Sequence, residues 1–319
     1  MAIVLVTGSE GFVGSRLCAR LEEQTSFRCR VVKAIRSGSA RSMDANTVAL
    51  DLLDPGSIDE AISSTRPDCV LHLAAISTTV AAPEAEKGVW ETNFEGTRSV
   101  LAAMAKHVPT SRIIFPSSAE VYGSSFVDGM PKDELSPVAP DNVYARSKLA
   151  VEFMLQSSMP ASMSGVALRL FNHTGLGQES KFVVPAFVSQ IAAIEQGKQE
   201  PTVRVGNIDV YRDFLDVEDV LDLYVQLIMM PSLPKRFAVY NVGSGFSRSL
   251  RDILDALISM SSIEIQVEVD PERYRSNAVP RVCSDIALVS ETFGWKPKVD
   301  FEDTLKTMLD HWREVHKSN

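Results

Sequence analysis

Tyr144 and Lys148 lie four residues apart in the stretch NVYARSK, which covers residues 142–148. Positions i and i+4 of a helix share a face, so we expect the Lys148 ammonium to lie beside the Tyr144 phenol and favour its ionised form. A free phenol titrates near pH ~10, so a tyrosine that works as an acid or base at neutral pH needs a cation held close to it. The pair therefore predicts an acid/base tyrosine.

Ser118 could hold a substrate next to this tyrosine. It belongs to the segment SSAEVYG (117–123), which directly follows a predicted strand over 113–116. A serine at the carboxyl end of a strand can donate a hydrogen bond to a carbonyl oxygen while Tyr144 delivers the proton. Ser118, Tyr144 and Lys148 thus form a predicted catalytic set.

A glycine-rich turn near the start of the chain predicts a dinucleotide site. The segment GSEGFVG (8–14) follows the first predicted strand and leads into a helix that begins at Phe12. Gly8, Gly11 and Gly14 let the backbone turn sharply and approach a pyrophosphate, and the helix amino terminus offers free N–H groups and a partial positive charge. The alternative is a tight turn that binds no ligand.

The end of the second predicted strand bears on which dinucleotide is bound. Enzymes that use NAD typically place an Asp or Glu there to bind the ribose 2′-hydroxyl, whereas this chain has Ile35, Arg36 and Ser37. Arg36, helped by Ser37 and Arg41, could pair with a 2′-phosphate, which favours NADP(H) and leaves NAD(H) possible. The alternative is a solvated basic loop.

Residues after the third and fourth strands complete the predicted cofactor site. Asp51 and Leu52 could contact the adenine edge, and the segment formed by Leu73, Ala74 and Ala75 leaves room for the ribose at the carboxyl edge of the sheet. These five residues are assigned to the cofactor, and so are Phe12 in the glycine turn and the pair Tyr144 and Lys148.

Two polar residues near the same edge are interpreted differently. His72 ends the fourth strand, but a lone histidine is more often a satisfied, partly buried residue than a catalyst. Asn93 could bridge backbone groups near the active site, with a helix-surface amide as the alternative. We assign Asn93 to the cofactor site and leave His72 out of it.

Short β-rich runs alternate with helical stretches in the first half of the chain. Strands are predicted over 3–7, 30–34, 47–50, 69–73, 113–116 and 166–170, and helices over 12–23, 58–63, 86–106 and 144–158. Beyond a loop that follows residue 171, we predict a helix from 185, a strand-like run to 216 and a helix over 217–230. The alternation is typical of parallel βαβ units, so the predicted fold class is α/β, a doubly wound parallel sheet (Rossmann) with a smaller interleaved carboxyl-terminal substrate domain. The dinucleotide domain is predicted over 1–170 and about 210–245, and the substrate domain over about 171–209 and 246–319.

Composition restricts the classes of partner. The 319 residues carry a net charge of −9, which argues against a nucleic-acid or anionic-membrane surface. No segment reaches about 18 uninterrupted apolar residues and the amino terminus has no leader pattern, so a cytoplasmic location is expected. The four cysteines show no paired spacing, which favours reduced thiols over disulfides or a metal site.

In this order, the glycine turn, the serine at the strand end and the YxxxK pair resemble the extended short-chain dehydrogenase/reductase family, also called the NAD-dependent epimerase/dehydratase family. The resemblance covers essentially the whole chain. Later segments resemble those of members that act on GDP-linked 6-deoxyhexoses. These segments are LRLFNHTGLGQ (168–178), GN (206–207), YRDFLDVEDV (211–220), YRSNAVPR (274–281) and GW (294–295).

The resemblance implies a nucleotide-sugar pocket. Its implied lining is Asn172, Val184, Asn207, Arg212 and Arg275. The two arginines would contact phosphate oxygens, because a guanidinium fork matches a phosphate. The alternative for each arginine is a surface ion pair with Asp213 or Glu272.

The resemblance also implies an enzyme that uses NADPH to reduce the C4 ketone of a nucleotide-linked, most of all GDP-linked, 4-keto-6-deoxyhexose. Dehydratases of the family carry a glutamate at the position of Glu120, preceded by an Asp or Ser and, one position earlier, a Thr; here Ala119 and Ser118 occupy those positions. A 4,6-dehydratase needs an extra acid/base to remove the C5 proton, so this departure favours the reductase. The alternatives are a GDP-mannose 4,6-dehydratase or a nucleotide-sugar 4-epimerase, with Glu120 as a further catalytic residue, and a non-catalytic nucleotide-binding protein. The helices predicted over 86–106 and 144–158 could form the seam of a homodimer.

Overall fold

The computed structural model describes residues 2–23, 29–36, 44–77, 83–274 and 279–318. The chain divides into two compact units that interleave along the sequence. Unit 1 comprises Met1–Gly123, Pro137–Leu170 and Leu221–Asn241; unit 2 comprises Ser124–Ser136, Phe171–Val220 and Val242–Asn319. Residues 124–136, 210–220 and 242–245 belong to unit 2, although they are predicted to lie in the dinucleotide domain. The predicted domain bounds stay a prediction.

Unit 1 is built on a seven-stranded sheet in the order β10-β6-β5-β4-β1-β2-β3. The strands are β1 (Ala2–Thr7), β2 (Cys29–Ile35), β3 (Thr47–Ala49), β4 (Cys69–His72), β5 (Arg112–Ser118), β6 (Ser164–Leu170) and β10 (Phe237–Val242). All pairings from β3 across to β6 are parallel. The chain order reverses between β1 and β4, which is the switch point of a doubly wound sheet. The predicted fold class is confirmed.

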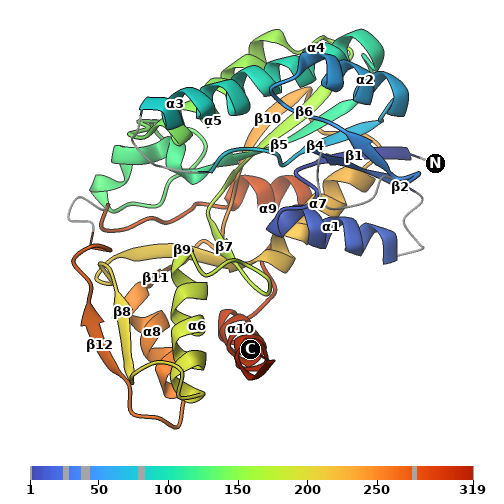
Figure 1. The fold of residues 1–319 in the computed structure, drawn as a ribbon. Helices are drawn as coiled ribbons and strands as arrows, with labels where there is room; N and C mark the ends of the chain where they lie inside the picture. The colour runs from blue at the N-terminus through green and yellow to red at the C-terminus, as the bar shows by residue number, and fades with distance from the viewer. Residues whose placement is uncertain (1, 24–28, 37–43, 78–82, 275–278, 319) are drawn as a thin grey trace. The chain divides into compact units, whose positions relative to one another are not determined.

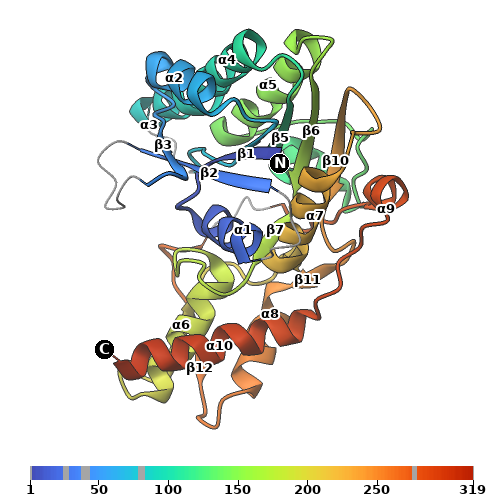
Figure 2. The same ribbon diagram turned by 90° about the vertical axis from the view of Figure 1, so that its right-hand side faces the viewer.

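Helices cover both faces of this sheet (Figures 1 and 2). On one face lie α2 (Pro55–Thr65), α3 (Pro83–Val89), α4 (Thr97–His107) and α5 (Val143–Ser158). On the other face lie α1 (Phe12–Glu23) and α7 (Val217–Met229). Because both faces are covered, the central strands are continuous apolar runs, and Val4, Leu5, Val70 and Leu71 are fully buried.

The helix predicted over 86–106 is present but is not one regular helix. A π-helix, η1 (Trp90–Gly96), joins α3 to α4. Such wide turns are rare and frequently mark functional sites. Asn93 lies in this segment, so the irregular turn sits where the sequence analysis places a cofactor-site residue.

In its described residues, unit 2 contains two small sheets and four helices of its own. The three-stranded sheet has the order β11-β9-β7 and the other pairs β12 with β8. The elements are β7 (Asn172–Thr174), α6 (Val183–Glu195), β8 (Thr202–Val205), β9 (Tyr211–Asp216), β11 (Ser247–Ser249), α8 (Leu250–Ser259), β12 (Gln266–Val269), α9 (Ala287–Phe293) and α10 (Phe301–Ser318). The helices α6, α8 and α10 lie against one another (Figure 2). Their shared core includes Val188, Leu254 and Leu309.

Within the ranges described, no helix combines the length and the apolar character needed to cross a bilayer.

Candidate active site

Ser118, Tyr144 and Lys148 come together in unit 1, at the carboxyl end of β5. Helix α5 begins at Val143 because the Oδ1 of Asn142 accepts a hydrogen bond of 2.9 Å from the backbone N–H of Ala145. Tyr144 therefore stands in the first turn of α5. Its side chain is hydrogen-bonded to Ser118, and the Nζ of Lys148 lies 5.7 Å from the centroid of its ring. The predicted geometry is present, and the catalytic role of the three residues stays a prediction.

Lys148 is a deeply buried cation. Its side chain is 4% exposed, its Nζ donates a 2.7 Å hydrogen bond to the carbonyl of Pro116, and it lies 4.6 Å from the centroid of the Phe115 ring. Burial lowers the pKa of Lys148 to about 7, and the negative charge of Glu152 acts in the opposite direction. The charge of Lys148 thus changes near neutral pH.

The surroundings of Tyr144 raise the pKa of its phenol. Burial, reinforced by the negative charge of Glu120, raises the pKa of Tyr144 above that of a free phenol, and the hydrogen bond with Ser118 offsets only part of this shift. Lys148 is not among the causes of this shift, so the expectation that it favours the ionised phenol stays a prediction. The phenol carries a proton at neutral pH, as a donor to a carbonyl oxygen must, and the raised pKa by itself makes it a weaker acid than a free phenol.

Glu120 lies close enough to influence Tyr144 but is itself engaged. It stands in the first turn of the 3₁₀ segment η2 (Ala119–Asp128). Its Oε2 accepts a 2.8 Å hydrogen bond from the Nδ2 of Asn142, and its backbone N–H donates to the Ser118 hydroxyl at 3.2 Å. The same asparagine therefore caps α5 and orients this carboxylate. A catalytic role for Glu120 stays a prediction.

His72 is held between two hydroxyl groups inside unit 1. Its Nδ1 shares a 2.9 Å hydrogen bond with the Thr7 hydroxyl, and its Nε2 shares one of 2.9 Å with the Thr97 hydroxyl. Burial, together with the positive charge of Lys148, lowers the pKa of His72 to about 3. Both ring nitrogens are hydrogen-bonded, as the interpretation of a satisfied histidine expects, and His72 is fully rather than partly buried.

Asn93 links the cofactor edge of the sheet to helix α5. Its Oδ1 accepts from the Ile76 N–H at 2.8 Å, and its Nδ2 donates to the Ile76 carbonyl at 2.9 Å and to the Ser147 hydroxyl at 3.0 Å. Ser147 in turn donates to the Tyr144 carbonyl at 2.7 Å. The predicted bridging role is confirmed, and the surface-amide alternative is wrong because Asn93 is buried.

A cavity of about 230 Å³ opens at the carboxyl ends of β1, β2 and β4. Six of its lining residues are among the predicted cofactor ligands: Gly8, Gly11, Arg36, Leu52, Ala74 and Ala75. Seven other lining residues were not predicted: Thr7, Ser9, Glu10, Ala34, Leu50, Ile76 and Thr92. Each of them lies near a predicted strand end, in the glycine turn or next to Asn93. The remaining predicted ligands do not line it: Phe12, Gly14, Asp51, Leu73 and Asn93. Tyr144 and Lys148, also predicted to contact the cofactor, lie outside this lining as well.

The glycine turn fits a dinucleotide because there is no room for a side chain at Gly8 and Gly14. Gly8 has φ +66°, and a Cβ there would lie 2.8 Å from the Ala74 backbone nitrogen. A Cβ on Gly14 would lie 2.2 Å from the Gly8 carbonyl oxygen. The N–H of Gly11 donates to that same oxygen at 3.1 Å, which closes the turn ahead of α1. This close backbone approach next to a helix amino terminus is the arrangement that receives a pyrophosphate.

Asp51 and Arg36, two predicted cofactor ligands, differ in their position relative to the cavity. The Oδ1 of Asp51 accepts from the Leu53 N–H at 2.9 Å, so this carboxylate orders its own turn. Arg36 is exposed at the rim of the cavity, directly after β2. Ser37 and Arg41 lie outside the described residues.

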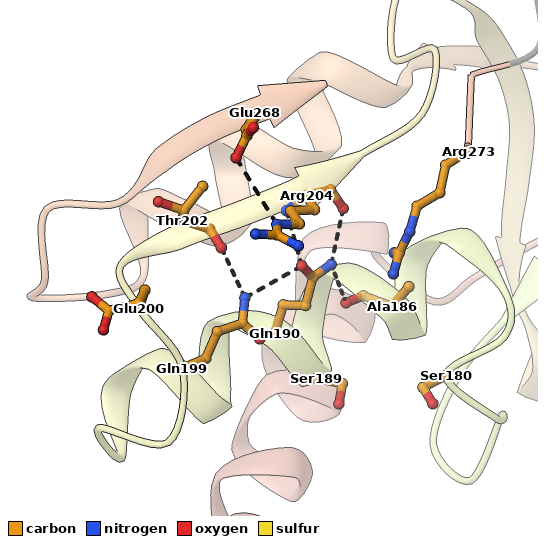
Figure 3. A pocket seen from close by; sticks show the side chains of 10 residues that line it. All are labelled: Ser180, Ala186, Ser189, Gln190, Gln199, Glu200, Thr202, Arg204, Glu268 and Arg273. Atoms are coloured by element: carbon orange, nitrogen blue, oxygen red, sulfur yellow. Dashed lines mark hydrogen bonds and ion pairs between the residues drawn. The ribbon is translucent and has the colours of Figure 1, made fainter. Parts of the chain in front are cut away.

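Unit 2 has a polar hollow of about 810 Å³ (Figure 3). Its lining is Ser180, Ala186, Ser189, Gln190, Gln199, Glu200, Thr202, Arg204, Glu268 and Arg273. Gln190 organises one wall, because its Oε1 accepts from the Arg204 N–H at 2.9 Å while its Nε2 donates to the Arg204 carbonyl at 3.2 Å. None of the five predicted sugar-nucleotide ligands belongs to this lining; in sequence, Asn207 lies three positions after Arg204 and Arg275 two after Arg273.

Arg212 ties two backbone segments of unit 2 together. Its Nη1 donates to the carbonyls of Tyr211 at 2.8 Å and Val279 at 2.9 Å. The carboxylate of Asp213, named as an alternative ion-pair partner, accepts hydrogen bonds from Ser244 at 2.6 Å and from Ser284. The phosphate contact of Arg212 stays a prediction.

The other predicted sugar-nucleotide ligands occupy different environments. Asn172 is exposed in β7, and the Oδ1 of Asn207 accepts from the Asp209 N–H at 3.0 Å. Val184 is fully buried in the unit 2 core. Arg275 lies outside the described residues.

Comparison with known proteins shows to which family the chain belongs. The sequence profile of the NAD dependent epimerase/dehydratase family matches residues 4–243. The chain belongs to this family. The prediction of an extended short-chain dehydrogenase/reductase is thereby confirmed, as is that of an NAD(P)-dependent nucleotide-sugar enzyme.

Individual members of the family are similar over nearly the whole chain. GDP-6-deoxy-D-mannose reductase of Pseudomonas aeruginosa is 34% identical over 311 residues, which are 97% of this chain and 96% of the relative. The structure of RMD from Pseudomonas aeruginosa complexed with NADPH has a TM-score of 0.84 and 32% identity, covering 99% of this chain and 100% of that chain. A Thermus thermophilus UDP-glucose 4-epimerase complex with NAD has a TM-score of 0.79 and 25% identity, covering 98% and 99%.

Proposed function

We propose that this family member uses NADPH to reduce the C4 ketone of a GDP-linked 4-keto-6-deoxyhexose to a hydroxyl group. The observation that carries the proposal is Tyr144, a phenol held in its protonated form and hydrogen-bonded to Ser118, with Lys148 beside its ring. The 34% identity to GDP-6-deoxy-D-mannose reductase supports the substrate class.

Each residue of the catalytic set has one role in this reaction. Ser118 orients the ketone oxygen through a hydrogen bond, Tyr144 donates its proton to that oxygen, and Lys148 holds the ribose of the nicotinamide. When bound, the reduced nicotinamide supplies the hydride that C4 receives. Holding donor and acceptor in one site replaces a bimolecular encounter by an effectively intramolecular step.

The alternative is a 4,6-dehydratase or a 4-epimerase, in which the hydride returns to the sugar. A dehydratase would use Glu120 to take the C5 proton. Here the neighbour of that carboxylate is the buried, apolar Ala119, and its Oε2 already accepts a hydrogen bond from Asn142. Both observations favour the reductase.

The absorbance of reduced nicotinamide distinguishes these functions, because a reductase consumes NADPH while a dehydratase or epimerase leaves it unchanged overall. We expect steady NADPH loss with GDP-4-keto-6-deoxymannose and no conversion of GDP-mannose. Conversion of GDP-mannose to the keto sugar without added reductant would overturn the proposal and make Glu120 the elimination base. Cofactor binding without turnover of either sugar would indicate a non-catalytic nucleotide-binding protein.

We infer that NADPH is preferred to NADH. Arg36 directly follows β2 and lines the cavity, where its guanidinium could pair with a 2′-phosphate. The relative complexed with NADPH supports this preference, whereas the Thermus thermophilus epimerase is complexed with NAD.

Arg36→Asp should reverse or abolish the preference for NADPH. A hydrogen bond to a charged group contributes about 1.5–3 kcal/mol, so NADPH affinity should fall at least about tenfold while NADH affinity is retained. The two dissociation constants, measured by fluorescence titration, test this, and Arg36→Gln separates loss of the cation from gain of a carboxylate. Equal affinities for the two cofactors in the unmodified protein would rule the idea out.

We further infer that unit 2 holds the nucleotide. Its polar hollow carries the guanidinium groups of Arg204 and Arg273, and Arg212 and Asn207 lie on neighbouring segments. Calorimetric titration of the full chain with GDP measures this directly. Failure of GDP to bind, with the cofactor still binding, would contradict the assignment.

We also infer a homodimer whose seam includes η1 and α5. Trp90 and Phe153 are large apolar side chains on these helices, and they are 37% and 58% exposed. Burying them against a second copy would remove apolar surface from water. Sedimentation velocity over a range of concentrations tests this, and a monomer throughout would exclude it.

A further inference from the structure

Glu152 and Arg169 form a buried ion pair close to the catalytic set. Glu152 lies on α5 one turn after Lys148, Arg169 lies on β6, and their residues are 4% and 6% exposed. The Nη2 of Arg169 donates to the Glu152 carboxylate at 2.8 Å, and its Nε donates to both carboxylate oxygens at 3.1 and 3.2 Å. The Ser117 hydroxyl donates to the same carboxylate. The carboxylate is therefore fixed in place by three donor groups.

Arg169 also belongs to a hydrogen-bonded chain with Tyr122 and Asn241. The Nη1 of Arg169 donates to the Tyr122 hydroxyl at 3.0 Å, and that hydroxyl donates to the Oδ1 of Asn241 at 2.7 Å. A buried ion pair is weak evidence for stability, because apolar residues of similar volume often replace one without loss. Stability alone therefore does not account for a charged pair at this position.

We propose that Glu152, held by Arg169 and Ser117, is a positioning residue that keeps the buried Lys148 amine protonated. Residues i and i+4 of a helix share a face, which places the carboxylate on the same side of α5 as Lys148. Burial disfavours the ammonium form and a nearby negative charge restores it. This proposal deepens the proposed function, since Lys148 is the residue assigned to the cofactor ribose there.

Other titratable groups face the pair formed by Tyr144 and Lys148 from the elements packed around it. They are His72 on β4, Glu120 on η2 and Tyr224 on α7. His72 is neutral because burial lowers its pKa to about 3. Burial raises the pKa of Tyr224, which therefore keeps its proton, and Glu120 is exposed to solvent. Within the part of the chain that the structure describes, Glu152 is thus the buried carboxylate best placed to act on Lys148.

The carbon-13 chemical shift of the Lys148 ε-carbon measures its protonation directly. The full-length protein is labelled with carbon-13 lysine, and the Lys148 resonance is assigned by its absence in Lys148→Met. In the unmodified protein we expect a titration midpoint well below that of exposed lysines. Glu152→Gln should lower this midpoint by about one unit or more, as expected on removing an opposite charge nearby. An unchanged midpoint would overturn the proposal.

Two further variants separate charge from packing. Glu152→Asp keeps the carboxylate and should leave the midpoint close to that of the unmodified protein; a shift as large as that of Glu152→Gln would show that charge is not the cause. The double variant Glu152→Met with Arg169→Met removes both charges and serves if Glu152→Gln does not fold. It should also lower the midpoint, and a midpoint equal to that of the unmodified protein would contradict the proposal.

The measurement needs no sugar substrate, so it stands even if the proposed reductase activity fails. If that activity is present, the pH above which turnover declines should move down together with the Lys148 midpoint in Glu152→Gln. A purely structural role would change the unfolding midpoint and leave this pH limit in place.

Discussion

Tyr144→Phe should lower the turnover number of ketone reduction by about 10²-fold or more, because general acid groups typically contribute 10²–10⁴-fold. Burial and the charge of Glu120 hold the pKa of Tyr144 above that of a free phenol, so the unmodified side chain carries the proton that the ketone oxygen needs. Phenylalanine keeps the ring that lies 5.7 Å from the Lys148 Nζ but has no proton to give. Single-turnover measurements with saturating NADPH and the keto sugar test this effect on the chemical step.

Tyr224→Phe is the matched control for this substitution. The Tyr224 side chain is also buried, and its hydroxyl has no hydrogen-bond partner among the residues described, so its removal should leave turnover unchanged. NADPH affinity should be nearly intact in Tyr144→Phe, whereas Lys148→Ala should weaken both NADPH binding and turnover. Near-normal turnover by Tyr144→Phe would remove Tyr144 from the mechanism.

The catalytic set could be predicted from sequence because its geometry follows local rules. The i, i+4 spacing places Tyr144 and Lys148 on one helix face, and Ser118 stands at a strand end where parallel sheets present their ligands. The protonation of Tyr144 could not be predicted this way. It depends on burial and on Glu120, which the fold brings near from 24 residues earlier in the chain.

The strands of unit 1 were predictable for a related reason. Strands buried on both faces, such as β1 and β4, are continuous apolar runs that are too short for helices. In unit 2, β7 and β11 have three residues each, which is too short to give a periodic signal, so residues 172–174 are predicted as a loop. No element is predicted after residue 230, although β10 adds an edge strand to the main sheet.

The ion pair of Glu152 and Arg169 shows what sequence patterns leave out. The two residues are separated by 17 positions and belong to different element types, so neither helical nor strand periodicity connects them. They meet because α5 packs against the strands that include β5. A sequence pattern identifies each as a charged residue, whereas only tertiary packing makes them a buried pair.

Gly14→Ala should weaken NADPH binding strongly even though alanine favours helices. Gly14 lies in the first turn of α1. A Cβ at this position would lie 2.2 Å from the carbonyl oxygen of Gly8, a distance shorter than Cβ atoms in real structures show. The turn between β1 and α1 must therefore open, and overpacking of this kind typically costs about 1–3 kcal/mol. Because about 1.4 kcal/mol corresponds to tenfold in affinity, the NADPH dissociation constant should rise by about five- to 150-fold.

The sign of the stability change separates this steric effect from helix propensity. Replacing glycine by alanine inside a helix ordinarily stabilises it by up to about 1 kcal/mol. Gly88, in α3, has open space where the Cβ of an alanine would lie, so Gly88→Ala should raise the unfolding midpoint and leave NADPH affinity unchanged. Gly14→Ala should instead lower both the midpoint and the affinity. Unchanged NADPH affinity in Gly14→Ala would mean that the turn can rearrange without weakening cofactor binding. The glycine segment could then no longer be assigned as the pyrophosphate site.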